Sequence, residues 1–250
     1  MSWTGDATAI EGMWERPFAL EGDGGIVPGA VWFAGRARPR PLVLLSHGGS
    51  GHALNASTRA TAKYLVHTGD FVVGAIDGPV HGRRRQDGDL DPGASLRAYR
   101  RHWTAGDGGR EAMTRDWRRA LDFMLEQPFV DPHRVGYMGL SMGTAYGIPL
   151  CARDSRIQAI VLGLWALDYP NSTDLSGYAR DILQPLLFLQ KRHDERMSQA
   201  GQLALFDSFG STSKQLNLYP GSHAGPCEAI NTDACGHLVR HLHQAPPSSP

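Results

Sequence analysis

Short apolar runs alternate along the chain with longer segments in which apolar residues recur at helical spacing. Residues 42–45 and 71–76 are apolar at almost every position, which is typical of central parallel strands covered by helices on both faces. Residues 110–127 instead place apolar side chains three and four positions apart, as in an amphipathic helix. From residue 41 onward, this alternation predicts an α/β fold built on one doubly wound, mainly parallel sheet.

The same reasoning assigns the remaining elements. The predicted strands are residues 16–20, 26–34, 42–45, 71–76, 135–138, 159–165, 185–190 and 214–219. The predicted helices are residues 57–67, 96–103, 110–127, 176–183, 198–209 and 227–243. The first two strands, joined by a Gly-rich hairpin turn at residues 22–25, are expected to form an antiparallel edge of the sheet. Without a repeat or a linker, residues 1–243 are expected to form a single domain and residues 244–250 a disordered tail.

The pentapeptide Gly139-Leu140-Ser141-Met142-Gly143 lies between a predicted strand and a small-residue segment that predicts a helix. This strand–turn–helix context is that of a nucleophile elbow, in which the glycines flanking the nucleophile avoid clashes between strand and helix. Three fixed positions in a Gly-rich chain also arise by chance, so the pentapeptide alone does not identify a catalytic serine. Such a serine needs partners from elsewhere in the chain.

Polar residues that directly follow predicted strands supply candidate partners, because ligands bind at this edge of a parallel sheet. Asp194 and His223 each follow a strand, and with Ser141 they occur in the order serine, acid, histidine, which is expected for an α/β-hydrolase fold. A serine hydroxyl needs a neighbouring base, imidazole can accept the proton and return it, and a carboxylate orients the imidazole. Glu195 and Asp168 are alternative acids, and Asp194 is favoured.

Four motifs that span most of the chain strengthen this interpretation, and the third is the most specific. They are Leu44-Leu45-Ser46-His47-Gly48-Gly49, Asp77-Gly78-Pro79-Val80-His81-Gly82-Arg83, Val130-Asp131-Pro132-His133-Arg134-Val135-Gly136-Tyr137-Met138-Gly139-Leu140-Ser141-Met142-Gly143 and Tyr219-Pro220-Gly221-Ser222-His223. With these motifs, the chain resembles α/β-hydrolases of the dienelactone-hydrolase-like group, which includes serine esterases. The resemblance implies that Ser141 is the nucleophile, His223 the general base and acid, and Asp194 the orienting acid.

The resemblance further implies an oxyanion hole made of two backbone N–H groups. One belongs to Met142, the residue after the nucleophile, and the other to Gly49, with Ser50 as the alternative donor. Such donors stabilise the charge that develops on the tetrahedral oxygen. Dienelactone hydrolases themselves carry a cysteine at the elbow. The serine at position 141 therefore favours ordinary ester hydrolysis over a dienelactone substrate.

Composition argues against several other classes of protein. The formal net charge is +0, so nothing indicates binding to nucleic acid or to an anionic membrane surface, and no apolar run approaches the roughly 20 residues of a membrane helix. The N-terminus lacks the pattern of a secretory signal, so we expect a cytoplasmic protein whose three cysteines are free thiols. No Cys or His spacing typical of a metal site occurs, and no metal or organic cofactor is expected.

Together these features predict a serine hydrolase that cleaves carboxylic esters through an acyl-enzyme on Ser141. The short connection between residues 165 and 185 predicts no separate lid domain, and hence an open site for small or soluble esters that residues 81–109 cover in part. Within that excursion, His81 is expected to stabilise the loop and the arginines 83–85 to be solvated. A peptidase or amidase, a thioesterase or a lactonase would use the same groups. A catalytically silent binding protein on this fold is the alternative of another class.

Overall fold

The computed structural model describes residues 1–35, 38–225 and 227–243, so the predicted tail at residues 244–250 lies outside the described residues. Within the described part, ten strands form one sheet in the order β1-β3-β4-β6-β5-β7-β8-β9-β10, with β2 paired to β3. The strands are β1 (Ser2–Trp3), β2 (Thr8–Ile10), β3 (Met13–Gly22), β4 (Gly25–Phe33), β5 (Arg40–Ser46), β6 (Val72–Ile76), β7 (Val130–Gly139), β8 (Ile157–Gly163), β9 (Leu186–Lys191) and β10 (Lys214–Tyr219). The helices are α1 (Ala56–Gly69), the 3-10 helix η1 (Gly82–Arg84), α2 (Pro92–Trp103), α3 (Arg110–Leu125), α4 (Met142–Arg153), α5 (Leu175–Arg180), α6 (Gln199–Ser208) and α7 (Glu228–Leu242).

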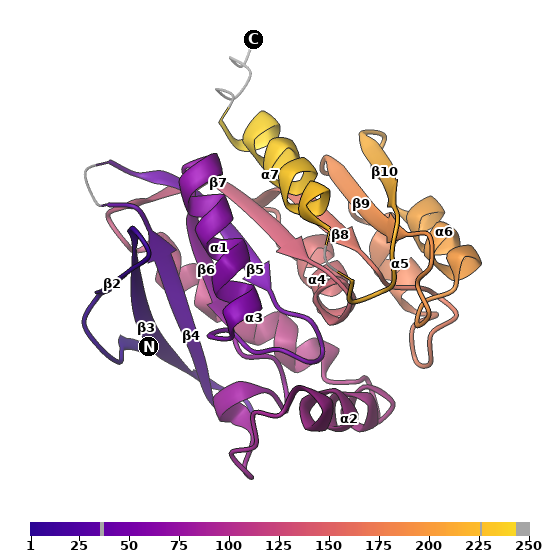
Figure 1. Cartoon of the computed structure of the whole chain (residues 1–250), viewed down its shortest axis with the longest axis horizontal. Helices are drawn as coiled ribbons and strands as arrows, with labels where there is room; N and C mark the ends of the chain where they lie inside the picture. The colour runs from indigo at the N-terminus through magenta and orange to yellow at the C-terminus, as the bar shows by residue number, and fades with distance from the viewer. Residues whose placement is uncertain (36–37, 226, 244–250) are drawn as a thin grey trace.

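The sheet is parallel over most of its width and antiparallel at its N-terminal edge. Strands β5 to β10 pair in parallel, whereas β1 to β4 pair antiparallel and β4 joins β6 antiparallel. The register of β3 and β4 runs to the pair Gly22 and Gly25, so the hairpin turn lies where the sequence predicted it. Figure 1 shows the N-terminal strands in indigo at one edge and β10 in orange at the other. The predicted fold class is confirmed.

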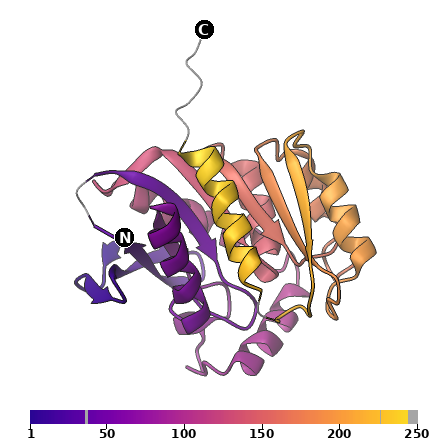
Figure 2. The same cartoon turned by 45° about the horizontal axis from the view of Figure 1, so that its top comes forward.

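The central strands are buried on both faces, as their apolar runs predicted. In β5, Leu42 and Leu44 belong to the core on one face of the sheet, whereas Val43 and Leu45 belong to the core on the other, because successive side chains of a strand point to opposite faces. Helices α1 and α7 cover one face, and α3, α4 and α5 cover the other (Figures 1 and 2). The carboxyl ends of the parallel strands emerge between these two layers.

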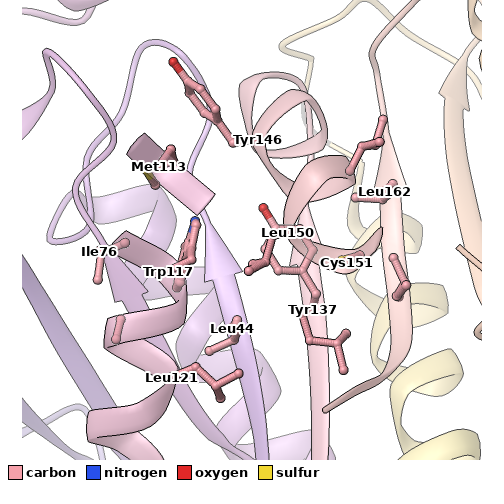
Figure 3. Close-up of a cluster of buried hydrophobic side chains, with 14 of the residues drawn as sticks. Leu44, Ile76, Met113, Trp117, Leu121, Tyr137, Tyr146, Leu150, Cys151 and Leu162 are labelled. Atoms are coloured by element: carbon pink, nitrogen blue, oxygen red, sulfur yellow. The ribbon is translucent and has the colours of Figure 1, made fainter. Parts of the chain in front are cut away.

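Packing of α3 and α4 on the second face fixes the position of Ser141. Three apolar residues of α3, namely Met113, Trp117 and Leu121, are buried against the sheet (Figure 3). The rings of Trp117 and Tyr137 on β7 meet edge to face with their centroids 6.1 Å apart, a favoured arrangement for aromatic pairs. Because β7 ends just before Ser141 and α4 begins just after it, this buried cluster holds both arms of the turn.

Several element bounds differ from the sequence prediction. Strand β8 ends at Gly163 rather than at residue 165, because Leu164 adopts a left-handed backbone with φ 55° and turns the chain away from the sheet. Helix α5 ends at Arg180 rather than at residue 183. It is the one helix in the described connection from β8 to β9, and no separate lid domain is present there. Strands β1 and β2 have only two and three residues, too few to display the period of two that marks a strand.

Candidate active site

Ser141 lies at a sharp turn between β7 and α4. Its backbone angles are φ 58° and ψ −121°, a sparsely populated region that costs on the order of 1–3 kcal/mol. A Cβ atom on Gly139 would lie 2.6 Å from the carbonyl oxygen of Gly143, and a Cβ atom on Gly143 would lie 2.9 Å from the carbonyl oxygen of Ser46. Strand and helix therefore approach so closely that both flanking positions require glycine, as expected of a nucleophile elbow.

The structure brings the three predicted side chains into one hydrogen-bonded chain. The Nδ1 atom of His223 lies 2.9 Å from each carboxylate oxygen of Asp194, and the Nε2 atom lies 2.9 Å from the Oγ atom of Ser141. Since a carboxylate only accepts hydrogen bonds, the ring proton resides on Nδ1 and donates to Asp194. Nε2 is then the acceptor for the Ser141 hydroxyl.

The two neighbouring acids after β9 serve different atoms of the same histidine. Asp194 accepts from the ring of His223, whereas Glu195 accepts the backbone N–H of His223 at 2.9 Å through its Oε2 atom. The third candidate, Asp168, accepts a hydrogen bond of 2.5 Å from the hydroxyl of Ser198 at the start of α6. The structure therefore places Asp194 at the histidine ring and Asp168 at a helix terminus.

Asp194 sits in a buried site that keeps it charged. Its side chain is 0% exposed, and it also accepts backbone hydrogen bonds of 2.9 Å from Arg196 and 3.0 Å from Met197. Burial raises the pKa of Asp194, but the hydrogen bonds from His223 and from these two amides outweigh burial and hold the pKa below its usual range. A carboxylate that is ionised near neutral pH keeps the imidazole in the tautomer that general-base chemistry requires.

His47 fixes the turn that follows β5. Its Nε2 atom accepts a hydrogen bond of 2.9 Å from the backbone N–H of Gly78, so the ring proton is on Nδ1 and donates to the carbonyl oxygen of Gly48 at 2.9 Å. Burial lowers the pKa of His47 to about 3, which keeps the ring neutral. The Gly48 carbonyl shares a planar peptide unit with the N–H of Gly49. The ring of His47 therefore orients the N–H group that the sequence predicted as an oxyanion donor.

The three candidate oxyanion donors have no hydrogen-bond acceptor in the part of the chain that the structure describes. They belong to Met142, Gly49 and Ser50. An unpaired N–H in a protected site costs about 1–3 kcal/mol, and Met142 is only 1% exposed. Unpaired donors beside a candidate nucleophile are what an oxyanion-binding site requires, so these groups stay candidates for that site.

Asp77 and His81 hold the loop after β6 against the same turn. Asp77 accepts backbone hydrogen bonds of 2.8 Å from Ala53 and 2.9 Å from Arg83. The Nε2 atom of His81 lies 2.9 Å from the carbonyl oxygen of Gly49, and burial lowers the pKa of His81. Both side chains thus orient loops, which is the structural role that the sequence predicted for His81.

The arginine run at residues 83–85 is only partly solvated, which corrects the sequence prediction. Arg84 pairs with the buried carboxylate of Asp116 at 2.8 Å, and Arg85 pairs with Asp87 at 2.5 Å. Only the first arginine of the run is exposed. Carboxylates on neighbouring segments explain the difference, because a paired guanidinium can be buried at much lower cost than a free one.

A cleft of about 350 Å³ opens above the elbow. Helix α2 contributes Leu96 and Tyr99 to its wall, so the excursion at residues 81–109 does border the site. Trp165 lines the cleft as well, whereas Trp103 is fully buried in the core next to it.

Other features of the chain add no further chemistry to the site. Among the described residues, no group of three or more His, Cys, Asp or Glu could hold a metal ion. Cys151, Cys227 and Cys235 are free thiols, and burial raises the pKa of Cys235 to about 11, which makes this thiol a poor nucleophile. In the described chain, every helix is too short or too polar to cross a membrane.

Over almost its whole length, the chain is similar to solved esterases. A cold-adapted esterase from an Arctic intertidal metagenomic library, solved as a PEG-bound complex, is 34% identical with a TM-score of 0.84, and the match covers 97% of this chain and 100% of that one. The chain belongs to the dienelactone-hydrolase-like esterases of the α/β-hydrolase superfamily. No protein-family model and no curated protein matches it.

More distant structures share the fold of this α/β-hydrolase. A dienelactone hydrolase from Anabaena variabilis is 19% identical with a TM-score of 0.70, and the match covers 93% of this chain and 100% of that one. An acetyl xylan esterase from Paenibacillus sp. R4 is 16% identical with a TM-score of 0.71, over 96% and 87% of the two chains. These structures support the fold, and the 34% identical esterase confirms the family predicted from the sequence motifs.

Several residues that support the site in this α/β-hydrolase were not predicted from its sequence. Glu195 was considered only as an alternative acid, yet it binds the backbone of His223. Lys191 is buried at the end of β9, and its ammonium group donates to the carbonyl oxygen of Gly225 in the histidine loop. The sequence holds one indication of this role, namely a lysine as the last residue of an apolar strand. Since lysine is rarely buried without a partner, such a lysine is expected to have one.

Proposed function

We propose that this hydrolase cleaves small or soluble carboxylic esters through an acyl-enzyme on Ser141, with His223 as base and Asp194 as its orienting acid. One observation carries the proposal. The hydrogen bonds from Ser141 to His223 and from His223 to Asp194 are unbroken, each at 2.9 Å, and both Ser141 and His223 line the cleft. A substrate carbonyl that enters the cleft meets the nucleophile with its base already in place.

The reaction proceeds in two halves. His223 accepts the proton of the Ser141 hydroxyl as the Oγ atom attacks the ester carbonyl carbon. When the tetrahedral intermediate collapses, His223 returns this proton to the leaving alcohol, and the acyl-enzyme remains. Water then enters, loses a proton to His223 and attacks the acyl carbon, and the second collapse releases the carboxylic acid and restores the Ser141 hydroxyl.

The oxyanion of both intermediates is assigned to the backbone N–H groups of Gly49 and Met142. Their support is the unpaired state of both groups within the described residues and the hydrogen bonds through which His47 orients the Gly49 peptide. Loss of one such donor typically raises the barrier by about 3–4 kcal/mol. Ser50, whose N–H is also unpaired, is the alternative partner for Met142.

The test is the Ser141→Ala variant, assayed with a short p-nitrophenyl ester and with a fluorophosphonate probe. We expect loss of hydrolysis and of labelling with an unchanged fold by circular dichroism, because the variant removes the attacking atom. The matched control is Ser222→Ala, an exposed serine beside the catalytic histidine, which should keep both signals. Turnover that persists without Ser141 contradicts the proposal, and a native protein that neither turns over nor labels is a silent binding protein.

A panel of matched substrates then separates the activities that the same groups can support. An amide, a thioester and a lactone with the acyl group of the best ester differ from it only in the leaving group. We expect the ester to have the highest kcat/KM, because the open cleft carries no feature that selects a peptide. A higher kcat/KM for the amide, thioester or lactone would reassign the reaction while keeping the mechanism.

A further inference from the structure

The cleft has two unlike walls. The first wall comes from α2 and from the connection after β8, and it is mainly aromatic and aliphatic, although the exposed Arg100 of α2 also lines the cleft. Leu96, Tyr99, Trp165 and Tyr169 line it, and the ring centroids of Trp165 and Tyr169 are only 4.6 Å apart. Tyr99 and Trp165 are almost fully buried, so these two rings are packed into the core behind the wall. Such a surface favours an apolar group of the substrate.

The second wall comes from the first turns of α1 and α7, which lie side by side on the other face of the sheet (Figures 1 and 2). It is built from hydroxyl and amide side chains, namely Asn55, Ser57 and Thr61 around the start of α1 and Asn231 in α7. In the described part of the chain, the side chains of Ser57, Thr61 and Asn231 have no hydrogen-bond partner, and Asn55 uses only its oxygen, as the cap of α1. This wall therefore offers several free donors and acceptors to a ligand.

The chemistry of the proposed reaction decides which half of the ester meets which wall. His223 must protonate the oxygen of the leaving alcohol, so the alcohol lies on the side of Ser141 that His223 occupies. The loop of His223 leads into α7, and His223, Ala224 and Asn231 line the cleft together. The alcohol therefore faces the polar wall, and the acyl group faces the aromatic wall.

We propose, on the basis of the function proposed above, that the natural substrates are esters of an apolar acyl group with a polyhydroxylic alcohol such as glycerol or a sugar. Hydroxyl groups of the alcohol replace the water that solvates the polar wall, whereas a hydrocarbon alcohol of the same shape displaces that water and returns no hydrogen bond. Sites built to bind a substrate hydroxyl discriminate strongly against analogues that lack it.

The experiment compares butyrate esters of polyhydroxylic alcohols with butyrate esters of hydrocarbon alcohols that have a similar shape. Glycerol 1-butyrate is paired with 2-methylbutyl butyrate, and methyl 6-O-butyryl-glucoside is paired with cyclohexylmethyl butyrate. Acid release is followed by pH-stat, with active sites counted by fluorophosphonate labelling. We expect a kcat/KM at least about tenfold higher for a polyol ester than for its match. The larger ratio of the two pairs identifies glycerol or sugar as the alcohol.

Variants of the polar wall assign the preference to named side chains. Thr61→Val and Asn231→Leu should each lower the ratio of kcat/KM for the polyol ester to kcat/KM for its hydrocarbon match by about fivefold, the value of one hydrogen bond. Thr68→Val is the control, since Thr68 is an exposed threonine of α1 that does not line the cleft. Its kinetics should match those of the native enzyme on both esters.

Two results overturn the inference, and they are distinguishable from failure of the proposed function. The polyol assignment is refuted if both hydrocarbon esters have an equal or higher kcat/KM than their polyol matches. It is also refuted if the variants slow both members of a pair equally. In either case, hydrolysis of p-nitrophenyl acetate through Ser141 still supports the esterase assignment. If no ester is hydrolysed in a reaction that depends on Ser141, the proposed function is wrong, and the substrate class falls with it.

Discussion

Ser141 is flanked by two segments that are held in place by opposite kinds of chemistry. On one side, the turn after β5 is fixed by the neutral ring of His47 and by the ring of His81, which lie against the carbonyl groups of consecutive peptides. On the other side, His223 is fixed by two carboxylates, Asp194 at its ring and Glu195 at its backbone N–H. The first arrangement depends on an uncharged ring at His47, and the second depends on the negative charge of Asp194.

The difference follows from what each segment must provide. An oxyanion donor has to be positioned without a nearby charge of its own, and a buried neutral histidine can accept at one nitrogen and donate at the other. In the proposed reaction, His223 instead becomes a cation, so a buried carboxylate beside it stabilises that state. Substitutions and pH should therefore affect the two segments in different ways.

The largest expected effect separates Asp194 from the other carboxylates. Asp194→Asn keeps the size of the side chain but places an amide beside Nδ1, so the imidazole is held in the wrong tautomer. We expect kcat to fall by about 10³–10⁴-fold, as in other triads that lose their acid. The control is Asp168→Asn, whose carboxylate binds Ser198 instead, and it should retain most activity. The reverse ranking of the two variants would transfer the acid role to Asp168.

The next effect tests the neutral side through His47. His47→Asn removes either the acceptor for Gly78 or the donor to Gly48, since a shorter side chain cannot reach both. We expect kcat to fall by about 10–100-fold, which is less than the loss of a whole oxyanion donor, while KM changes little because the substrate ground state is bound elsewhere. His52→Asn is the matched control on the same turn.

A structural role alone would give a different pattern for His47. If the variant lowered stability and raised KM while kcat stayed native, then the ring would hold the turn without positioning the oxyanion donor. Binding of a boronic acid that mimics the tetrahedral intermediate provides an independent readout. Its affinity should fall in parallel with kcat for His47→Asn and stay unchanged for His52→Asn.

A smaller effect tests the charged side through Glu195. Glu195→Ala removes the acceptor of the His223 N–H and should lower kcat by about three- to tenfold, because one hydrogen bond to a partly exposed group is lost. Glu195→Gln retains a carbonyl oxygen in the same place and should recover most of that activity. If both variants were equally impaired, the charge of Glu195 rather than its geometry would be what supports His223.

The sequence predicts the part of this comparison that follows from sheet topology, but it does not predict contacts between loops that are far apart in the chain. Ser141, Asp194 and His223 each follow a strand, and the topology of a parallel sheet alone brings such residues to one edge. The contacts of His47 with Gly78 and of Glu195 with His223 join separate loops, and no local pattern encodes them. The early end of β8 escaped prediction for a related reason, since a left-handed leucine leaves the apolar run unchanged.

The smallest expected effect is a difference in acid sensitivity between the two segments. The pKa of His47 is lowered by burial to about 3 in the folded protein, against about 6.5 for an unperturbed histidine. Between these values the unfolded chain binds a proton that the folded protein does not, so stability is complete above about pH 6.5 and falls as the pH drops toward about 3. The pKa of Asp194 is held below its usual range, so its contribution is lost only below about pH 4.

Urea unfolding at pH 7.5, 6.0 and 5.0 measures this difference. The free energy of unfolding of the native protein should fall toward pH 5.0 by up to about 1.4 kcal/mol per pH unit for each such histidine, and His81 and His237, whose pKa values burial also lowers, contribute to the same slope. For His47→Asn, the free energy of unfolding should depend less steeply on pH, by the contribution of one histidine. For Asp194→Asn, the pH dependence above pH 5.0 should equal that of the native protein. If the free energy of unfolding of His47→Asn depended on pH as steeply as that of the native protein, the ring of His47 would not stay neutral in the folded protein. The proposed difference between a neutral segment and a charged segment beside Ser141 would then be wrong for the neutral segment.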